Sequence, residues 1–191
     1  MSLVLVISGP AGVGKTTICN RLLEEFRNHL TRVVTTTTRK PRKGETHGKD
    51  YYFTELNEFK SLVKKNAFLE HELIHGNYYG TSKRAVYDKI KRSKNVLINI
   101  DVAGAKNLST KISEENKFET KIVSIFLKPN NLNVLEDRLK QRGSDSHEEI
   151  NRRLETAKNE ILFADNFNHL IVSDEKDCDY RTVKEIYLNN I

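Results

Sequence analysis

Cysteine is scarce in this chain of 191 residues: Cys19 and Cys178 are the only two. They lie far apart and belong to no paired-cysteine motif, which excludes a disulfide framework and predicts reduced thiols. Cys19 falls on a predicted helix, where it is expected to pack in the core rather than to carry redox chemistry. The six histidines form no zinc-like cluster, so no zinc site is expected.

Long hydrophobic runs are also missing. No apolar stretch approaches the roughly 20 residues that span a bilayer, and the apolar run Leu3 to Ser8 is too short for a signal peptide. The sequence contains no repeat, linker or low-complexity tract. These absences predict a single cytoplasmic domain of ordinary size without a membrane partner.

The positive charge of the chain needs a partner of opposite sign. A formal net charge of +6 invites comparison with nucleic-acid-binding proteins. The sequence shows no RNA-binding motif, however, and several basic residues concentrate in two short stretches, Arg39–Lys43 and Arg138–Arg153. This concentration favours a small anionic substrate, and we expect no nucleic-acid partner.

Residues 9–16, GPAGVGKT, match the phosphate-binding loop pattern of Gly, any four residues, Gly, Lys and Ser or Thr. An apolar run rich in β-branched residues precedes the loop, as expected for a buried parallel strand. An amphipathic helical pattern follows it from Thr17 to Leu30. Strand, loop and helix in this order favour a nucleoside triphosphate site over a Gly-rich turn that binds nothing.

The chemistry of the loop predicts roles for its residues. The glycines let the backbone N–H groups point inward around phosphates, and the following helix adds the positive end of its dipole. Lys15 can reach the outer phosphates of ATP, and the Thr16 hydroxyl can bind Mg²⁺. The residues expected to bind ATP are Gly9, Pro10, Ala11, Gly12, Val13, Gly14, Lys15, Thr16 and Thr17.

A basic loop follows the second predicted strand, Val33–Thr38. The loop covers residues 38–53 and lies where the C-terminal ends of parallel strands meet a ligand, which favours a binding role over a solvated turn. A helix over residues 55–65 comes next, and then a hairpin over 68–82 with a Gly-Asn turn. Residues 50–81 therefore predict a mostly antiparallel insertion suited to binding a substrate.

Core strands are predicted again over residues 96–101, 121–127 and 169–173. The first ends at Asp101, where a strand-end carboxylate would face Mg²⁺. The last helix is expected over Tyr180–Asn189.

Two helices rich in arginine are predicted over residues 132–142 and 146–164. Arg138 and Arg142 lie one turn apart on the first helix, and the second carries Arg152 and Arg153. A short Gly-Ser-Asp-Ser linker joins them, which suggests a mobile lid that closes over phosphates. A solvated helical hairpin is the alternative.

Taken together, several separated segments resemble the guanylate kinase family, in the family's order, from about Leu3 to Ser173. The segments are SGPAGVGKTT, TTTRKPRKGETHGKDYYF, FLEHE, HGNYYGT, INIDVAG, RLKQRG and INRRL. The resemblance implies transfer of the γ-phosphoryl group of ATP to GMP, giving ADP and GDP, with Mg²⁺, as a step of purine metabolism. It also implies an α/β fold of the P-loop nucleoside monophosphate kinase type.

The same resemblance divides the chain and assigns its residues. A parallel-sheet core flanked by helices would take up about residues 1–35, 82–135 and 165–191, with a small mixed α/β GMP-binding insertion over 36–81 and a helical lid over 136–164. The residues implied to bind GMP are Thr35, Arg39, Arg42, Tyr51, Glu70, Tyr79, Thr81, Asn99 and Asp101. Those implied in catalysis are Lys15, Arg39, Arg138, Arg142 and Arg153, and those at Mg²⁺ are Thr16 and Asp101.

These residue types suit the chemistry independently of the family. Two arginines and two tyrosines offer charge-assisted and neutral hydrogen bonds to a phosphate dianion. Guanine presents N1–H and its 2-amino group side by side, and the Glu70 carboxylate can accept from both. Adenine would set its N1 lone pair against that carboxylate, and leaving a buried charge unpaired costs at least about 1–3 kcal/mol.

Three positions depart from the family pattern. Asn99 stands where an acid usually contacts guanine, so its amide oxygen can accept but carries no charge. Ala103 replaces a frequent glutamine, and Ser173 replaces a common asparagine near adenine, which leaves the preference for ATP over other triphosphates open. Thr35 and Thr81 replace serine and keep the hydroxyl.

Two other functions remain open from the sequence. A phosphotransferase acting on another nucleoside monophosphate or on a sugar phosphate could use this scaffold, and Asn99 alone points that way. A protein-binding domain that has lost catalysis would typically lack an intact phosphate loop, whereas Lys15 and Thr16 are present. The choice between monomer and homodimer and the acceptance of dGMP are also open.

Overall fold

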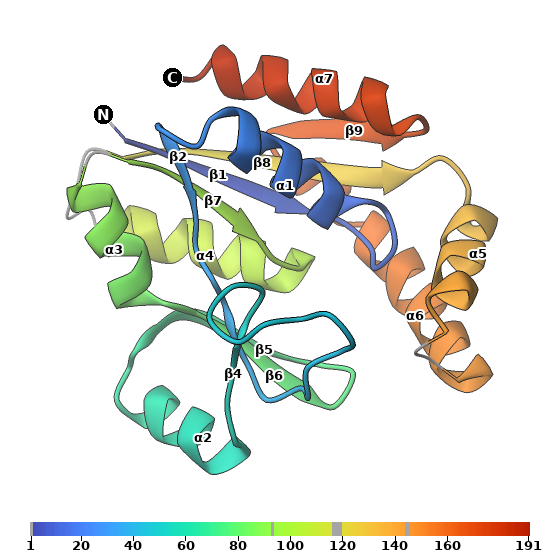
Figure 1. The fold of residues 1–191 in the computed structure, drawn as a ribbon, viewed down its shortest axis with the longest axis horizontal. Helices are drawn as coiled ribbons and strands as arrows, with labels where there is room; N and C mark the ends of the chain where they lie inside the picture. Colours follow the sequence, from blue (N-terminus) through green and yellow to red (C-terminus); the bar gives the residue numbers. More distant parts are fainter. Residues whose placement is uncertain (1, 93, 116–119, 144–145) are drawn as a thin grey trace.

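The computed structural model describes residues 2–92, 94–115, 120–143 and 146–191, apart from the side chains of residues 115 and 142. Within these ranges the chain forms two sheets flanked by helices (Figure 1). The strands are β1 (Ser2–Ser8), β2 (Leu30–Arg32), β3 (Thr36–Thr37), β4 (Tyr52–Phe53), β5 (Phe68–Ile74), β6 (Asn77–Ser82), β7 (Asn95–Asn99), β8 (Thr120–Pro129) and β9 (His169–Ser173). The helices are α1 (Lys15–Glu25), α2 (Leu56–Lys64), α3 (Lys83–Lys91), α4 (Val102–Glu115), α5 (Leu132–Arg142), α6 (His147–Ile161), the 3₁₀ turn η1 (Ala164–Asn166) and α7 (Lys176–Leu188).

The larger sheet is parallel, with the strand order β2-β7-β1-β8-β9. Its helices lie on both faces, with α1 and α7 on one and α3 and α4 on the other (Figure 1). This arrangement confirms the predicted α/β fold with a parallel sheet flanked by helices. It also brings the C-terminal ends of β1 and β7 side by side, where a ligand is expected.

The central strand β1 is buried on both faces, because successive side chains of a strand point to opposite sides. Leu3, Leu5 and Ile7 enter a core closed by α1 and α7, whereas Val4 and Val6 enter a second core closed by α3 and α4. The continuous apolar run of this segment is what a strand between two layers of helices requires. The phosphate-loop motif therefore begins at the end of a strand that is anchored from both sides.

Cys19 and Cys178 are both free thiols, as predicted. Cys19 lies in the core between α1 and the parallel sheet and is buried. Burial raises the pKa of its thiol to about 12, against the opposing charges of Arg32 and Lys15. The thiolate is therefore disfavoured at neutral pH, in agreement with a packing role for Cys19.

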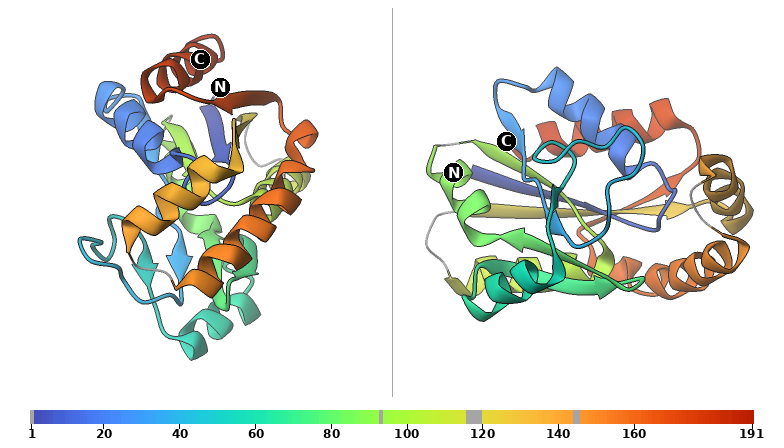
Figure 2. Two further views of the ribbon diagram at one scale, coloured as in Figure 1. Left: turned by 90° about the vertical axis from the view of Figure 1, so that its right-hand side faces the viewer. Right: turned by 60° about the horizontal axis from the view of Figure 1, so that its bottom comes forward.

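The smaller sheet has the order β4-β3-β6-β5 and carries helix α2 (Figures 1 and 2). Phe59 of α2 is fully buried and stacks on Phe68 and Tyr78, with ring centroids 4.8 and 5.4 Å apart. Gly80 makes room for this cluster, since a Cβ there would lie 2.9 Å from the Phe68 ring. This aromatic packing gives the small sheet its own apolar centre.

The hairpin between β5 and β6 is confirmed, but the predicted Gly-Asn turn is wrong. The turn residues are His75 and Gly76, with φ of 48° and 77°, and Ile74 pairs directly with Asn77. Two residues with positive φ between paired strands match the twist of a tight hairpin. Asn77 belongs to the strand, and His75 takes the strained position instead.

The strand predicted over Val33–Thr38 has other bounds in the structure, because β2 ends at Arg32, before the predicted range, and β3 covers only Thr36–Thr37. Leu30–Arg32 pairs with β7 in the larger sheet, and Thr36–Thr37 pairs with β4 and β6 in the smaller one. Val33 still donates its N–H to Leu97, after which the chain crosses between sheets. A run of β-branched residues predicts an extended backbone, but it does not predict in which sheet the segment finds its partner strand.

Two helix ends also differ from the prediction. Helix α1 ends at Glu25 rather than near Leu30, because Leu30 is buried in the larger sheet as the first residue of β2. The spacing of Leu22, Phe26 and Leu30 suits a helix, but strand pairing determines the outcome. Helix α7 begins at Lys176 rather than at Tyr180, with acidic residues in its first turn that favour a helix N-terminus.

At the linker that joins them, the two arginine-bearing helices have the predicted boundaries. Gly143 ends α5 with φ of 64°, a left-handed position that glycine adopts without strain. Ser146 caps α6 by accepting a hydrogen bond from the Glu149 N–H at 3.2 Å. The middle of the predicted linker, Ser144 and Asp145, lies outside the described residues.

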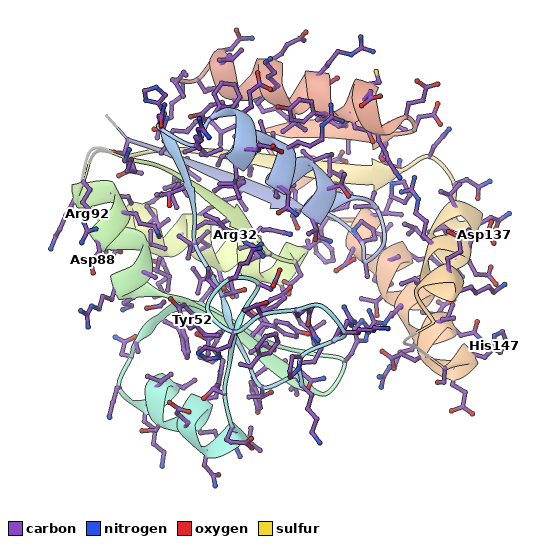
Figure 3. All side chains as sticks on the ribbon, in the orientation of Figure 1. Arg32, Tyr52, Asp88, Arg92, Asp137 and His147 are labelled. Atoms are coloured by element: carbon purple, nitrogen blue, oxygen red, sulfur yellow. The ribbon has the colours of Figure 1, made fainter. Side chains whose placement is uncertain are left out.

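In the described part of the chain, no helix combines the length and apolarity that crossing a bilayer would need. The helices are amphipathic instead. On α5, Leu135 and Leu139 are buried while Asp137 is exposed, and Figure 3 shows Asp137 and His147 pointing away from the molecule.

Candidate active site

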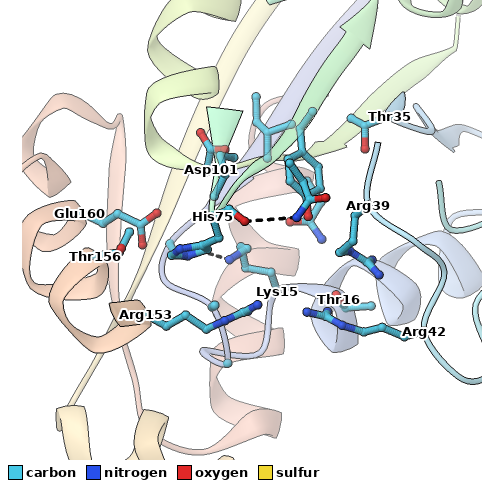
Figure 4. A pocket seen from close by; sticks show the side chains of 18 of the residues that line it. Lys15, Thr16, Thr35, Arg39, Arg42, His75, Asp101, Arg153, Thr156 and Glu160 are labelled. Atoms are coloured by element: carbon cyan, nitrogen blue, oxygen red, sulfur yellow. Dashed lines mark hydrogen bonds between the residues drawn. The ribbon is translucent and has the colours of Figure 1, made fainter. Parts of the chain in front are cut away.

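A cavity of about 960 Å³ lies at the C-terminal ends of β1 and β7. The smaller sheet forms one wall, and helices α5 and α6 form the opposite wall (Figure 4). The residues predicted for the site that line this cavity are Gly9, Ala11, Gly12, Gly14, Lys15, Thr16, Thr17, Thr35, Arg39, Arg42, Tyr51, Glu70, Tyr79, Asn99, Asp101, Arg138 and Arg153. The fold thus brings together residues that are far apart in the sequence, from Gly9 to Arg153.

The phosphate-loop motif turns sharply between β1 and α1. Gly9 has φ of 137°, and a Cβ at this position would lie 2.3 Å from the carbonyl oxygen of Leu127, so only glycine fits. Gly14 also has positive φ, and α1 begins at the next residue, Lys15. The first N–H groups of α1, which have no partner within the helix, therefore open toward the cavity.

The Lys15 side chain curls over this loop. Its ammonium donates to the carbonyl oxygens of Gly9 and Pro10, the latter at 3.0 Å. This geometry holds a positive charge at the mouth of the loop. Pro10 itself is buried and contributes its carbonyl rather than a surface to the cavity.

Helix α5 contacts the same loop through Arg138. One guanidinium nitrogen, Nη1, donates to the carbonyl oxygens of Gly12 and Val13, both at 3.2 Å. Val13 is 2% exposed and packs in the core, so its side chain lies behind the cavity. Arg142 was predicted on the same face of this helix, one turn after Arg138. Its backbone belongs to α5, and its side chain lies outside the described part of the chain.

The basic loop is organised by an acid that the sequence did not single out. Glu45 accepts from Arg39 Nη2 at 2.8 Å through one carboxylate oxygen and from the Arg42 N–H at 2.7 Å through the other. Burial would raise the pKa of Glu45, but the hydrogen bonds from Arg39 and Arg42 hold it below its ordinary value. A charged Glu45 therefore holds the Arg39 side chain and the Arg42 backbone at neutral pH.

Two tyrosines stand beside Arg39. The rings of Tyr51 and Tyr79 lie 6.0 Å apart in an edge arrangement, and the Arg39 guanidinium carbon lies 5.3 Å from the Tyr51 ring centre. Burial raises the pKa of Tyr51, so its hydroxyl stays protonated and can donate at neutral pH. Guanidinium and phenol donors thus share one corner of the cavity.

Glu70 is a buried carboxylate, 6% exposed, on strand β5. It accepts a 2.5 Å hydrogen bond from the Thr81 hydroxyl, which is fully buried behind it, so Thr81 reaches the cavity only through Glu70. Gly104 borders the other carboxylate oxygen, because a Cβ there would lie 2.9 Å from it. Burial raises the pKa of Glu70 to about 7, against the opposing hydrogen bond from Thr81.

Asp101 follows β7 and accepts a hydrogen bond from the Gly104 N–H at 2.8 Å. Burial raises its pKa above the ordinary value, although the positive charge of Lys15 acts in the opposite direction. Thr16, in the first turn of α1, lines the same cavity with its hydroxyl. Carboxylate and hydroxyl oxygens are the ligands that Mg²⁺ prefers, so this donor set fits the ion.

Other polar residues that line the cavity were not predicted from the sequence. They are His75, Asn77, Gln141, Glu149, Thr156, Glu160 and Lys176. Burial raises the pKa of Glu160 to about 6, with the charge of Lys15 opposing and that of Asp101 adding to the shift. Helical spacing could have found three of them, because Glu149, Thr156 and Glu160 share one face of α6 with Arg153.

Asn99 and Ser173, two of the three positions that depart from the family pattern, have different surroundings. Asn99 lines the cavity, so its amide is within the site. Ser173 is 7% exposed, and its hydroxyl donates to the Asp179 carboxylate at 2.6 Å. Its polar atom is therefore engaged within the protein.

The raised pKa of Glu70 predicts a pH-dependent stability. In its ionised form the buried carboxylate destabilises the folded state. This cost is absent below pH 4.5, where the group is protonated in both states, grows as the pH rises, and is complete above pH 7. At pH 8, the free energy of unfolding of Glu70→Gln without nucleotide should exceed that of the wild type by up to about 3 kcal/mol.

Denaturant titrations across this pH range test the prediction. The difference between the two proteins should shrink as the pH falls toward 4.5. A difference that stays constant between pH 5 and pH 8 would contradict the raised pKa.

Comparison with known proteins gives an independent measure of similarity. The family model described as guanylate kinase matches residues 1–190. The guanylate kinase of Rickettsia felis is 38% identical over 184 residues, which cover 96% of this chain and 92% of that protein. The guanylate kinase of Caldanaerobacter subterraneus is 36% identical over 186 residues, covering 97% of this chain and 86% of that protein. A crystal structure of guanylate kinase from Anaplasma phagocytophilum matches with a TM-score of 0.79 at 29% identity, covering 99% of this chain and 86% of that one.

Proposed function

The chain belongs to the guanylate kinase family, whose enzymes phosphorylate GMP to GDP with ATP, and we propose that it does so by in-line, Mg²⁺-assisted transfer within the 960 Å³ cavity. The observation that supports this proposal is that two groups of residues suited to binding phosphate line one cavity. The phosphate loop with Lys15 forms the first, and Arg39, Arg42 and the two tyrosines form the second. GDP made here would enter the purine nucleotide pool of the cytoplasm.

The donor nucleotide would bind at the phosphate loop. The N–H groups at the start of α1 would hold its β- and γ-phosphates, and Lys15 would add charge where the transferred group leaves. The carbonyl oxygens of Gly9 and Pro10 support this assignment, because they keep the ammonium at the mouth of the loop. Arg138, bonded to the loop backbone, would follow the same phosphates.

The acceptor GMP would place its phosphate against Arg39 and Arg42, with Tyr51 and Tyr79 as neutral donors. Its base would lie toward Glu70, which can accept from N1–H and the 2-amino group of guanine. These two bonds would favour the ionised form of Glu70, so GMP binding should lower the pKa of this carboxyl.

Further residues of the acceptor site would complete the recognition of the base. Thr35 and Asn99 line the cavity and would contact guanine directly, whereas Thr81 would act by orienting Glu70.

Mg²⁺ would be held by the Thr16 hydroxyl and the Asp101 carboxylate, directly or through water. When bound, the ion neutralises charge that develops on the phosphoryl oxygens. The protein's own part is to hold Asp101 in place through the Gly104 N–H and to present Lys15 and the arginines to the same oxygens. No covalent intermediate on the protein is required.

The proposal also assigns work to the segments of the chain. Residues 36–81 would bind GMP, residues 136–164 would act as a lid that brings Arg138, Arg142 and Arg153 to the phosphates, and the rest would form the core. Closing the lid would exclude water, which otherwise competes with GMP for the phosphoryl group.

A coupled assay that follows ADP release tests the function. The enzyme is assayed with MgATP and, in turn, GMP, AMP, CMP and UMP. We expect turnover with GMP to exceed that with AMP by orders of magnitude and to stop when EDTA is added in excess over Mg²⁺. Equal turnover with GMP and AMP would overturn the proposal.

A further inference from the structure

Glu149 occupies the centre of a charged cluster at the edge of the cavity. It lies in the first turn of α6, and its carboxylate accepts from Arg153 Nε at 3.1 Å and from Arg152 Nη2. One of its oxygens also lies 4.0 Å from His75 Nδ1, on the hairpin between β5 and β6. Glu149 therefore contacts two residues of its own helix and one residue from the opposite wall.

Three of the four side chains in this cluster are largely shielded from solvent. The side chains of Arg153, His75 and Glu149 are 12%, 16% and 21% exposed, whereas Arg152 is 58% exposed. Charge-assisted hydrogen bonds are stronger where water is excluded, so the bond to Arg153 should hold its geometry better than the bond to Arg152. Figure 4 shows Arg153 reaching from α6 toward Lys15 and Arg42.

His75 reaches the cluster at a conformational cost. Its φ of 48° is unusual for a residue other than glycine, and in the described chain only Asn66 shares this feature. The strained turn directs the imidazole into the cavity between the small sheet and α6 (Figure 4). A glycine or asparagine would form the same turn with less strain, which argues that the side chain itself is used.

We propose that Glu149 is a positioning residue that aims Arg153 at the transferred phosphoryl group, and that His75 links this pair to the acceptor side of the site. The proposal rests on the proposed function, since Arg153 needs a phosphoryl group to act on. Glu149 holds the guanidinium through its Nε, and Arg153 lines the cavity. The contact across the cavity ties the orientation of Arg153 to the hairpin that carries Tyr79.

A purely structural role for Glu149 is the competing explanation. An acid in the first turn of a helix stabilises the helix N-terminus through the dipole. Glu148 lies in the same turn and is exposed, so it shares this contribution without a contact to Arg153. The pair Glu149→Gln and Glu148→Gln therefore separates the two roles, because each variant removes one charge from the same turn.

Steady-state kinetics with MgATP and GMP provide the first test. We expect Glu149→Gln to lower kcat about 10- to 100-fold, the range that misplacing a reacting geometry can cost, with the KM values for GMP and ATP changed less than about threefold. Glu148→Gln should keep the kcat of the wild type, and the melting temperatures of the two variants should agree. Glu149→Asp keeps the charge on a shorter side chain and should recover part of the loss. A normal kcat for Glu149→Gln would overturn the proposal, as would an equal loss for Glu148→Gln.

A double-mutant cycle with Arg153→Gln gives the second test. If Glu149 acts through Arg153, Glu149→Gln should have almost no further effect on kcat in the Arg153→Gln background. A loss of the same size in both backgrounds would assign Glu149 a role unrelated to Arg153 and overturn the proposal.

The His75 link is tested by His75→Asn, which tolerates positive φ. We expect a roughly 3- to 10-fold lower kcat, again absent in the Arg153→Gln background. An unchanged kcat would overturn the link across the cavity. These results are distinguishable from failure of the proposed function, because in that case the wild type itself would release no ADP in response to GMP.

Discussion

Replacing Lys15 with alanine is expected to lower kcat about a thousandfold, which corresponds to about 4 kcal/mol of transition-state stabilisation. The reason is the placement of its ammonium at the mouth of the phosphate loop, bonded to the Gly9 and Pro10 carbonyls. Charge spreads over the moving phosphoryl oxygens in the transition state, so losing this cation affects the reaction more than the binding of substrates.

The measurement is kcat at saturating MgATP and GMP, together with calorimetric titration of GMP. The GMP dissociation constant of Lys15→Ala should stay within about threefold of the wild type, because Lys15 lies at the donor end of the cavity. Lys64→Ala, an exposed lysine at the end of α2, serves as the matched control and should be fully active. A Lys15→Ala variant with near-normal kcat would remove the phosphate loop from the mechanism.

Glu70→Gln should collapse the preference for GMP over AMP. A site built on hydrogen bonds to the correct base can reject the wrong one by roughly 10⁴-fold, and we expect the variant to lose at least about 100-fold of that ratio. The Thr81 hydroxyl donates to Oε1 of Glu70. In the variant this bond would keep the amide oxygen near Thr81 and turn the NH₂ group toward the base, where it meets guanine N1–H as a second donor.

Adenine would gain from the same change, because its N1 can accept from the new NH₂ group. The ratio of kcat/KM for GMP to that for AMP measures the effect directly. Glu72→Gln, two residues along the same strand, is the control and should preserve the ratio. An unchanged ratio in Glu70→Gln would show that guanine is read elsewhere.

Much of the architecture follows from the sequence because its signals are local. The apolar run ending at Ser8 and the glycines after it predict a buried strand and a turn, and both are confirmed. Helices α2 and α5 begin and end within about a residue of the prediction, since each has an amphipathic pattern with clear boundaries. The parallel sheet follows from alternating strands and helices.

The crossing of the chain from the larger sheet at Leu30–Arg32 to the smaller sheet at Thr36–Thr37 could not be predicted from the sequence, because the partner strands β7 and β6 lie more than 40 residues away. The hairpin turn at His75 was missed for another reason. Gly-Asn is a common turn pair, so local preference favoured Gly76 and Asn77 over His75 and Gly76.

The candidate site shows the same contrast. Cations that would bind phosphate stand out in the sequence as clusters, and the fold collects them on one cavity. The carboxylates that orient them do not stand out, because Glu45 and Glu149 resemble ordinary surface acids until their partners are known. Thr81 illustrates a further limit, since only the structure reveals that it lies behind Glu70.

A crystal structure of the enzyme with GMP and ADP tests the central claim most directly. The account predicts guanine N1 and the 2-amino group within hydrogen-bond distance of the two Glu70 oxygens, and the GMP phosphate on Arg39, Arg42, Tyr51 and Tyr79. The ADP phosphates should lie on the N–H groups that precede and begin α1. A GMP molecule bound with its base away from Glu70, or its phosphate away from Arg39, would contradict the account.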